Sequence, residues 1–259
     1  MIIDLSEETV EPFFRCLSDD ETEWSAGACR RAEWFRKLQS GGLRGKLAEE
    51  EDGELSGMVQ YGPIEHLFPD SSGLYFVYCI WVKRQKKGPN YQKKGIGSAL
   101  LHEVEEDVRR LGAKGLVVWG IKFPFWMQAS WFRKKGYTVI DTLGMARLLW
   151  KPFEEGFEPP RWMRAKKRPE KVSGQVTVTA FISGWCTAAN SQALFARQAA
   201  EELGERVVYR EIDLLDQENI REWGLTDTVF VDGKEIGKGP PMPYKKIKKK
   251  IQKTLKKLS

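Results

Sequence analysis

The stretch NYQKKGIGSALLHEV, Asn90 to Val104, follows an apolar run, LYFVYCIWV, that extends from Leu74 to Val82. This order predicts a strand, then a basic loop, then a helix that begins near Gly97. Gly95 and Gly97 carry no Cβ, so the backbone there can turn sharply and present its N–H groups outward. The start of the helix adds the positive end of its dipole. Together these features predict an anion site, with phosphate as its usual occupant.

The spacing of the glycines narrows the kind of phosphate site. A Walker A loop would need GxxxxGK[ST], which is absent, and a Rossmann loop would need a third glycine where Leu100 stands. The stretch instead resembles the Q/R-x-x-G-x-G/A loop of the GNAT acetyltransferase superfamily. The matching residues are Gln92, Lys93, Lys94, Gly95, Ile96 and Gly97, followed by Ser98. The resemblance implies that the loop amides hold the pyrophosphate of acetyl-CoA, which serves as co-substrate.

The order of predicted elements over residues 1 to about 150 extends the resemblance. These elements are a strand over 2–5, helices over 7–17 and 30–38, strands over 45–50, 55–61 and 74–82, a helix over 96–111, a strand over 116–121, a helix over 125–137 and two terminal strands. Such an order is similar to the GNAT fold. It implies an α/β domain with a mixed central sheet and flanking helices.

The resemblance implies further contacts with the coenzyme. The strand before the loop should diverge from its neighbour at Ile80, Trp81 and Val82, whose backbone groups would meet the pantetheine arm and the oxyanion. Relative to the family, RQKKG (84–88) is inserted before Pro89. We expect Lys87 in this insertion to contact the 3′-phosphate of the coenzyme, although a solvated loop is an equal alternative.

The WFRKKGY stretch departs from the family at the position of the usual acid. Trp131 and Phe132 are expected to lie beside the coenzyme, but Phe132 stands where many members have a tyrosine that protonates the departing thiolate. A thiol has a pKa of about 8.5, so thiolate can leave near neutral pH without that acid. An alkyl amine has a pKa of about 10.4 and needs a base more urgently.

The candidate bases are Glu65, His66 and Tyr78, with Cys79 as a more distant one. Each has a plainer interpretation, because Glu65 and His66 fit a solvated loop while Tyr78 and Cys79 fit a core strand. The acceptor pocket should be aromatic, which favours a small, partly apolar amine. Its candidate residues are Trp24, Trp34, Trp81, Trp126 and Trp131.

The overall composition is that of a globular protein. The 259 residues are 41% apolar and 30% charged, and no apolar stretch approaches the roughly 18 residues of a spanning helix. The N-terminus is acidic, which does not fit a signal peptide, and the four cysteines form no CxxC or Cys/His cluster. We expect a cytoplasmic protein without membrane partners, disulfides or a metal site.

The net charge of +6 belongs to the second part of the chain. Residues 1–150 hold 21 basic and 21 acidic side chains, whereas residues 151–259 hold 21 and 15. A basic tail can bind nucleic acid. Here, however, the apolar residues at 247, 251, 255 and 258 predict a helix packed on a sheet with solvated lysines, which argues against nucleic acid as a partner.

A proline-containing stretch divides the chain. We predict a first domain over residues 1–152, a linker over 153–173 and a second domain over 174–259. The second domain's order of strand, helix, strand, helix, hairpin and helix resembles a thioredoxin-like fold, and the two-domain order resembles YoaP-type proteins. Cys186 lies at the expected turn, but Ala189 replaces the second cysteine and Asp227 the usual proline. The WCxxC motif therefore cannot support dithiol exchange.

The sequence thus favours an acetyl-CoA-dependent N-acetyltransferase that modifies an amine, with a small molecule as the favoured acceptor. One alternative is a protein that binds or senses coenzyme A without catalysis, as the loss of the tyrosine would allow. A second is a monothiol redox protein that acts through Cys186. The sequence leaves the oligomeric state open, with a homodimer among its alternatives.

Overall fold

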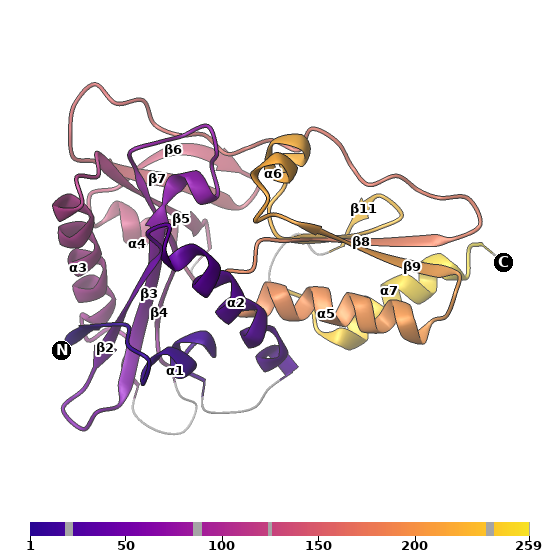
Figure 1. The fold of residues 1–259 in the computed structure, drawn as a ribbon, viewed down its shortest axis with the longest axis horizontal. Helices are drawn as coiled ribbons and strands as arrows, with labels where there is room; N and C mark the ends of the chain where they lie inside the picture. The colour runs from indigo at the N-terminus through magenta and orange to yellow at the C-terminus, as the bar shows by residue number, and fades with distance from the viewer. Residues whose placement is uncertain (19–22, 85–89, 124–125, 237–240, 259) are drawn as a thin grey trace. The chain divides into compact units, whose positions relative to one another are not determined.

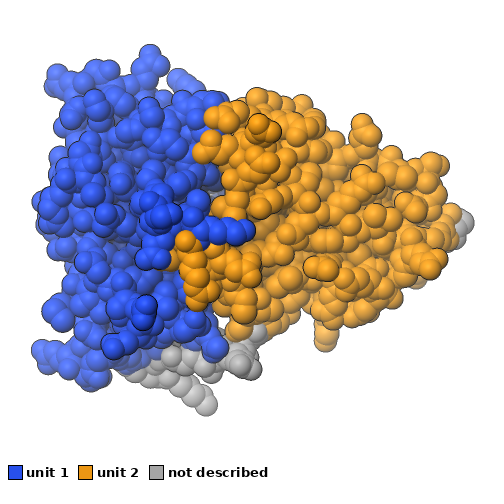
Figure 2. Space-filling view, in the orientation of Figure 1, with its two compact units in different colours: residues 1–19, 37–162 blue, residues 20–36, 163–259 orange. Residues whose placement is uncertain are grey.

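The computed structural model describes residues 1–18, 23–84, 90–123, 126–236 and 241–258, and the chain forms two compact units (Figures 1 and 2). One comprises Met1–Asp19 and Lys37–Trp162, and the other comprises Asp20–Arg36 and Met163–Ser259. The predicted domain boundaries differ from this division. The sequence assigns residues 20–36 to the first domain and residues 153–162 to a linker.

A seven-stranded mixed sheet forms the centre of the first unit. Its strand order is β1-β2-β3-β4-β5-β7-β6, and the β4–β5 pair is parallel while the other pairs are antiparallel. The strands are β1 (Ile2–Asp4), β2 (Arg44–Glu49), β3 (Leu55–Pro63), β4 (Tyr75–Val82), β5 (Gly115–Ile121), β6 (Thr138–Leu143) and β7 (Ala146–Pro152). The mixed sheet and the order of the strands in the chain confirm the predicted α/β architecture.

Two of the predicted helices are much shorter than expected. The helices that begin before residue 150 are α1 (Val10–Phe14), α2 (Ala28–Gln39), α3 (Ile96–Arg110) and α4 (Ala129–Arg133), with 3₁₀ turns η1 (Glu23–Gly27) and η2 (Ile64–His66). Helix α1 ends early because Cys16 and Leu17 both adopt positive φ, at 55° and 57°. Helix α4 begins late because Met127 also has positive φ, at 48°, and Gln128 is extended.

Helix α3 packs unusually close to the sheet because β3 carries a glycine beneath it. A Cβ at Gly57 would lie only 2.9 Å from Ile96 Cγ2 and 3.0 Å from Leu100 Cδ1. Gly57 pairs with Val82 at the end of β4. Because Gly57 has no side chain, the first turn of α3 can pack beside the end of β4. The sequence predicts the anion site at this place.

The second unit is a small mixed α/β sheet with the strand order β11-β10-β8-β9. Its strands are β8 (Val176–Ile182), β9 (Val207–Asp213), β10 (Thr228–Val231) and β11 (Lys234–Glu235), and its helices are α5 (Thr187–Glu202), α6 (Gln217–Trp223) and α7 (Tyr244–Leu255). Strands β8 and β9 are parallel, and β10 is antiparallel to β8 and β11. The order of elements agrees with the prediction for the second domain.

Residues 23–36 belong to this second unit through contacts that span more than 150 positions in sequence. The Ser191 hydroxyl accepts from the Gly27 N–H at 2.9 Å and lies 2.6 Å from the Trp24 carbonyl oxygen. A Cβ at Gly27 would fall 2.1 Å from the Thr187 carbonyl oxygen, so only glycine permits this approach. Arg30 forms a bidentate ion pair with Glu211.

Within the described ranges, no helix combines the length and the apolar character that a bilayer crossing requires.

Candidate functional site

The first feature of the site is the separation of two neighbouring strands. The parallel ladder between β4 and β5 ends at Val77 and Val118, although β4 continues to Val82 and β5 to Ile121. Along this stretch β4 stays paired with β3 as far as Val82 and Gly57. The last residues of β4 therefore diverge from β5, which is the arrangement that the resemblance implies for Ile80, Trp81 and Val82.

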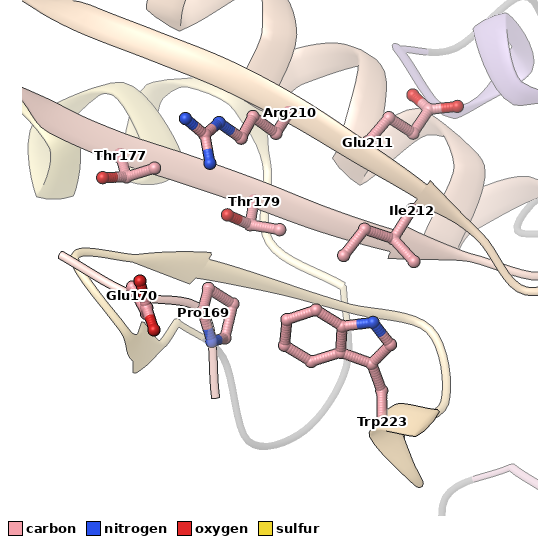
Figure 3. A pocket seen from close by; sticks show the side chains of 8 residues that line it. All are labelled: Pro169, Glu170, Thr177, Thr179, Arg210, Glu211, Ile212 and Trp223. Atoms are coloured by element: carbon pink, nitrogen blue, oxygen red, sulfur yellow. The ribbon is translucent and has the colours of Figure 1, made fainter. Parts of the chain in front are cut away.

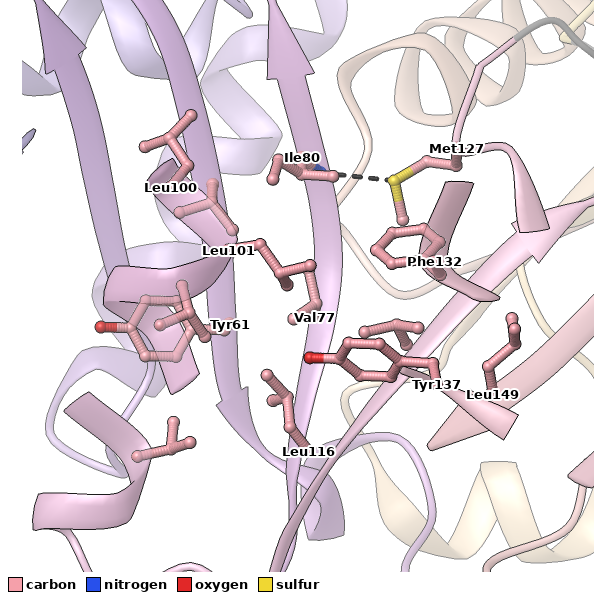
Figure 4. Close-up of a cluster of buried hydrophobic side chains, with 14 of the residues drawn as sticks. Tyr61, Val77, Ile80, Leu100, Leu101, Leu116, Met127, Phe132, Tyr137 and Leu149 are labelled. Atoms are coloured by element: carbon pink, nitrogen blue, oxygen red, sulfur yellow. Dashed lines mark hydrogen bonds between the residues drawn. The ribbon is translucent and has the colours of Figure 1, made fainter. Parts of the chain in front are cut away.

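A β-bulge at Tyr78 accompanies the separation. The register between β3 and β4 steps from Gln60↔Cys79 to Tyr61↔Val77, so Tyr78 is an extra residue without an opposite partner. Val77 and Ile80 consequently both face the buried cluster beneath α3, although residues three apart in a regular strand point to opposite faces (Figure 4). The bulge thus re-aims the end of β4.

Met127 fills the space where the strands part. Its carbonyl oxygen accepts a hydrogen bond from the Ile121 N–H at 2.7 Å, and this bond occupies the edge of β5. Its sulfur lies 3.4 Å from the backbone nitrogen of Ile80 in β4 (Figure 4). Trp119 adds a third bond, because its indole N–H donates to the Tyr78 carbonyl oxygen at 2.8 Å. A Cβ at Gly120 would lie 2.7 Å from the Met127 carbonyl oxygen, so glycine is needed for this crossing.

The exposed edge of β4 retains backbone groups that can bind a ligand. Lys83 N–H donates to the Ser56 carbonyl oxygen, so the alternating pattern turns the polar groups of Ile80 and Val82 away from β3. Gln92 Nε2 donates to the Val82 carbonyl oxygen at 3.3 Å. The Ile80 C=O and the Val82 N–H make no hydrogen bond with the residues described, which leaves one acceptor and one donor on this edge.

The loop before α3 presents a second set of unsatisfied groups. Gly95 caps the helix with φ of 88°, and Lys93 also adopts positive φ, at 65°. The N–H groups of Ser98 and Ala99 both turn back to the Gly95 carbonyl oxygen. In the parts of the chain that are described, nothing accepts from the N–H groups of Lys93, Lys94, Gly95, Ile96 or Gly97. These amides sit at the positive end of a 15-residue helix, which is the arrangement that binds a phosphate.

Gly97 faces Trp131 across this loop. A Cβ at Gly97 would lie 3.6 Å from Trp131 Cζ2 and 3.6 Å from Val82 Cγ2, which is ordinary contact. Trp131 from α4 is half-buried and packs edge-on against Phe132, with 4.9 Å between ring centroids. The structure therefore brings together Trp131, Gly97 and the end of β4, which belong to three separate sequence elements.

Comparison with known proteins agrees with this geometry. Residues 4–123 match the family model described as "Acetyltransferase (GNAT) family". This part of the chain is a GNAT acetyltransferase domain. Its enzyme class is that of the GNAT N-acetyltransferases. No curated protein matches the chain.

Several solved structures are similar to the chain. PaiA N-acetyltransferase from Thermoplasma acidophilum, in complex with coenzyme A, is 18% identical over 59% of this chain and 98% of the other, with a TM-score of 0.44. A GNAT family acetyltransferase from Brucella melitensis, in complex with acetyl-CoA, is 20% identical over 62% and 91%, with a TM-score of 0.41. YhbS from Escherichia coli, in complex with CoA, is 13% identical over 60% and 82%, with a TM-score of 0.44.

The insertion in the GNAT domain is closed at its base. Arg84 and Asn90 form an isolated antiparallel bridge. Lys87, the predicted contact for the 3′-phosphate, lies outside the described residues. Lys93 and Lys94 are both exposed, and the Lys94 ammonium lies 5.3 Å from the centre of the Tyr91 ring. Exposed cations beside unsatisfied amides give this loop a positive potential.

Tyr91 and Glu54 anchor the loop to the start of β3. The Tyr91 hydroxyl donates to Glu54, and Lys83 Nζ lies 3.0 Å from the same carboxylate. The hydrogen bond from Tyr91, followed by the one from Lys83, lowers the pKa of Glu54, and the bond to Glu54 raises the pKa of Tyr91 to about 12. This anchor holds Lys83 and Tyr91, which lie on either side of the insertion in the sequence, against one carboxylate.

The three candidate bases lie on or near η2 and the middle of β4. Glu65 Oε1 accepts from the Gly73 N–H at 3.1 Å, and His66 Nε2 lies 3.1 Å from the Gly41 carbonyl oxygen. Tyr78 is buried, and its pKa is raised by burial first and by the charge of Glu65 second. Glu65 and Tyr78 are therefore electrostatic neighbours, and Tyr78 holds its proton at neutral pH.

Two predicted site residues have side chains that serve the core. Phe132 is fully buried between Trp131 and Tyr137, and the Ile80 side chain is 8% exposed within the same cluster. Ile80 can contact a ligand only through its backbone. Two of the tryptophans predicted for the acceptor pocket pack inside the second unit instead, because Trp24 stacks against Phe195 and Trp34 lies against Gly184.

Met127 and Trp119 are site residues that the sequence analysis missed. Their roles depend on a sulfur and an indole N–H that reach β4 from positions 41 to 47 residues away. In the sequence, only the adjacent Gly120 and the nearby tryptophans hinted at these roles. Neither feature indicates that the side chains of Met127 and Trp119 would bond to the backbone of β4.

Replacing Tyr91 with Phe is expected to lower the stability of the protein near pH 7. A carboxyl group with a lowered folded pKa contributes stability above its unfolded pKa of about 4.3, and this contribution is lost as the pH falls through the folded value. Melting temperatures should therefore differ most at pH 7 and converge once the pH falls below the lowered, folded-state pKa of Glu54. Tyr75→Phe is the control, because the Tyr75 hydroxyl donates no hydrogen bond to a described residue. A Tyr91→Phe deficit that is independent of pH would contradict this role.

Proposed function

We propose that the GNAT domain transfers the acetyl group of acetyl-CoA to an amine by direct attack. The observation that carries this proposal is the combination of five unsatisfied N–H groups, Lys93 to Gly97, with the open edge of β4. The loop amides suit the pyrophosphate, and the Val82 N–H and Ile80 C=O suit the amide groups of the pantetheine arm. A ligand held at both places would run along β4 toward the bulge.

The Ile80 N–H is the proposed donor to the acetyl carbonyl oxygen. Its present acceptor is the thioether of Met127, which is a weak one. The carbonyl oxygen gains negative charge during attack and becomes a much stronger acceptor than the sulfur. A hydrogen bond from the Ile80 N–H to this oxygen, in place of the one to Met127, would therefore stabilise the tetrahedral intermediate. Attack forms the C–N bond, and collapse breaks the C–S bond and releases the thiolate.

Glu65 is the proposed base for the amine proton. It lies in η2, the turn that follows β3, and its charge acts on the buried Tyr78 at the bulge of β4. His66 follows it in the same turn, but its Nε2 is engaged with the Gly41 carbonyl oxygen. The thiolate can leave without a protein acid, which suits a domain with Phe132 at the position of the family's tyrosine.

The rival function is coenzyme binding without turnover, which the buried Phe132 favours. Both functions require the loop to hold the coenzyme. They differ only in whether free thiol appears when amines are added. The acceptor is proposed to be a small, partly apolar amine, as the half-buried Trp131 and Trp81 beside the site support.

The second unit is proposed to be thioredoxin-like, and the whole chain YoaP-like. This is supported by the parallel β8–β9 pair joined through α5, and by the antiparallel β10–β11 hairpin that leads to α7. Cys186 is the N-cap of α5. Asp227 accepts from the Ser183 N–H at 2.8 Å and lies 2.5 Å from its hydroxyl, so a carboxylate holds the turn where a redox protein would have proline.

Replacing Gly97 with Glu is expected to weaken acetyl-CoA binding by at least about tenfold, because a carboxylate would enter the phosphate site. The backbone should tolerate a side chain at this position, since a Cβ at Gly97 makes only ordinary contacts, and the melting temperature of the variant checks that it folds. Calorimetric titration with acetyl-CoA measures the effect. Leu111→Glu adds the same charge at the exposed far end of α3 and should bind like the native protein. Equal affinity of the Gly97→Glu variant would contradict the proposed site.

Replacing Glu65 with Gln is expected to lower kcat by about 100-fold in an amine-dependent assay of thiol release. The amide oxygen of Gln can still accept from the Gly73 N–H, so the turn should keep its shape. His66→Gln is the matched control from the adjacent position and should retain native kcat. If the two variants lose activity equally, Glu65 is not the base.

A further inference from the structure

The second unit contains a pocket of about 400 Å³ that is remote in sequence from the coenzyme loop (Figure 3). It opens on one face of the small sheet, between β8, β9, the end of α6 and the segment that precedes β8. Its volume lies within the range of about 300–1,000 Å³ that is typical of small-molecule sites. Acetyl transfer as proposed above uses no residue of this pocket.

The polar end of the pocket comes from two neighbouring strands. Thr177 and Thr179 alternate along β8 and so face the same side, and Thr179 is paired with Arg210 of β9. Paired residues project to the same face of a sheet, so the Arg210 side chain lies beside the two threonines (Figure 3). The next residue, Glu211, points the other way and forms an ion pair with Arg30.

The polar groups at this end have no partner among the described residues. The Thr177 hydroxyl belongs to a side chain that is 3% exposed, and it makes no hydrogen bond within the described part of the chain. Arg210 is exposed, and it forms neither an ion pair nor a hydrogen bond with any residue that the structure describes. A buried hydroxyl without a partner is uncommon in native proteins, and it often marks a ligand or water site. A cation beside such hydroxyls is suited to a carboxylate.

The opposite end of the pocket is apolar. Its wall is formed by the Trp223 indole, Pro169 and Ile212. Pro169 is held against the β10–β11 turn, because a Cβ at Gly233 would lie 2.7 Å from the Pro169 carbonyl oxygen. The Lys166 N–H also donates to the Trp223 carbonyl oxygen at 2.9 Å, so the wall is fixed at both ends.

We propose that this pocket binds a small monocarboxylate with a planar apolar body. The carboxylate would bind Arg210 with Thr177 and Thr179 beside it, and the apolar body would lie against Trp223 and Pro169. Glu170 is exposed at the rim and disfavours ligands that carry a second negative charge. The second unit is thus a ligand-binding module, in addition to any role of Cys186.

Calorimetric titration of the full chain with phenylacetate and with indole-3-acetate tests the proposal. The expected result is saturable binding of at least one acid and at least about tenfold weaker binding of 2-phenylethanol, which has the ring without the charge. Arg210→Gln should weaken binding of the acid by about tenfold or more. Thr177→Val, which removes the unpartnered hydroxyl at constant shape, should weaken binding and raise the melting temperature.

Arg197→Gln is the matched control, since Arg197 is an exposed arginine on α5 in the same unit, and it should bind like the native protein. All variants should retain native acetyl-CoA binding, which separates this proposal from the proposed function. Absence of saturable binding of both acids by the native protein would overturn the proposal. Equal affinity for 2-phenylethanol, or undiminished binding by Arg210→Gln, would overturn it as well.

Discussion

The site depends on the separation of β4 from β5, and the hydrogen bond from the Ile80 N–H to the Met127 sulfur lies where these strands separate. A parallel pair of strands would normally continue its ladder, but here the Met127 carbonyl oxygen takes the Ile121 N–H and ends the pairing with β5. Strand β4 is left with an open polar edge in the interior of the sheet, away from its edge strands β1 and β6. An open edge is normally a liability for a sheet, so its retention beside a loop of unsatisfied amides points to an occupant that forms strand-like hydrogen bonds.

The placement of α3 follows from the same end of the sheet. Gly57 lets the first turn of the helix approach β3, and the Gln92 side chain ties the loop to the Val82 carbonyl oxygen. The helix start and the open strand edge thus lie together, although they belong to different segments of the chain. One ligand with a phosphate at one end and amides along its length would satisfy both. Acetyl-CoA has this form.

Much of the GNAT domain could be predicted because its signals are local. The glycine spacing around Gly95 and the apolar stripe of α3 are written in consecutive residues, and the helix forms over Ile96–Arg110, within one residue of the predicted range. The bond of Met127 to β4 could not be predicted, because it joins residues 47 positions apart through a side chain without a distinctive pattern. Membership of residues 23–36 in the second unit was missed for the same reason, since Gly27 meets Ser191 only in the folded chain. The candidate bases stay predictions, because loops and strands alike can carry Glu65 or Tyr78 for structural reasons.

On this view the loop amides and the open edge of β4 hold acetyl-CoA together. Residue-resolved amide hydrogen exchange, measured with and without saturating acetyl-CoA, tests this arrangement. Exchange of the Lys93 to Gly97 and Val82 amides is expected to slow markedly on binding, while amides of the β6–β7 pair should change little. Binding of acetyl-CoA that leaves the exchange of these loop and β4 amides unchanged would show that the coenzyme is held elsewhere.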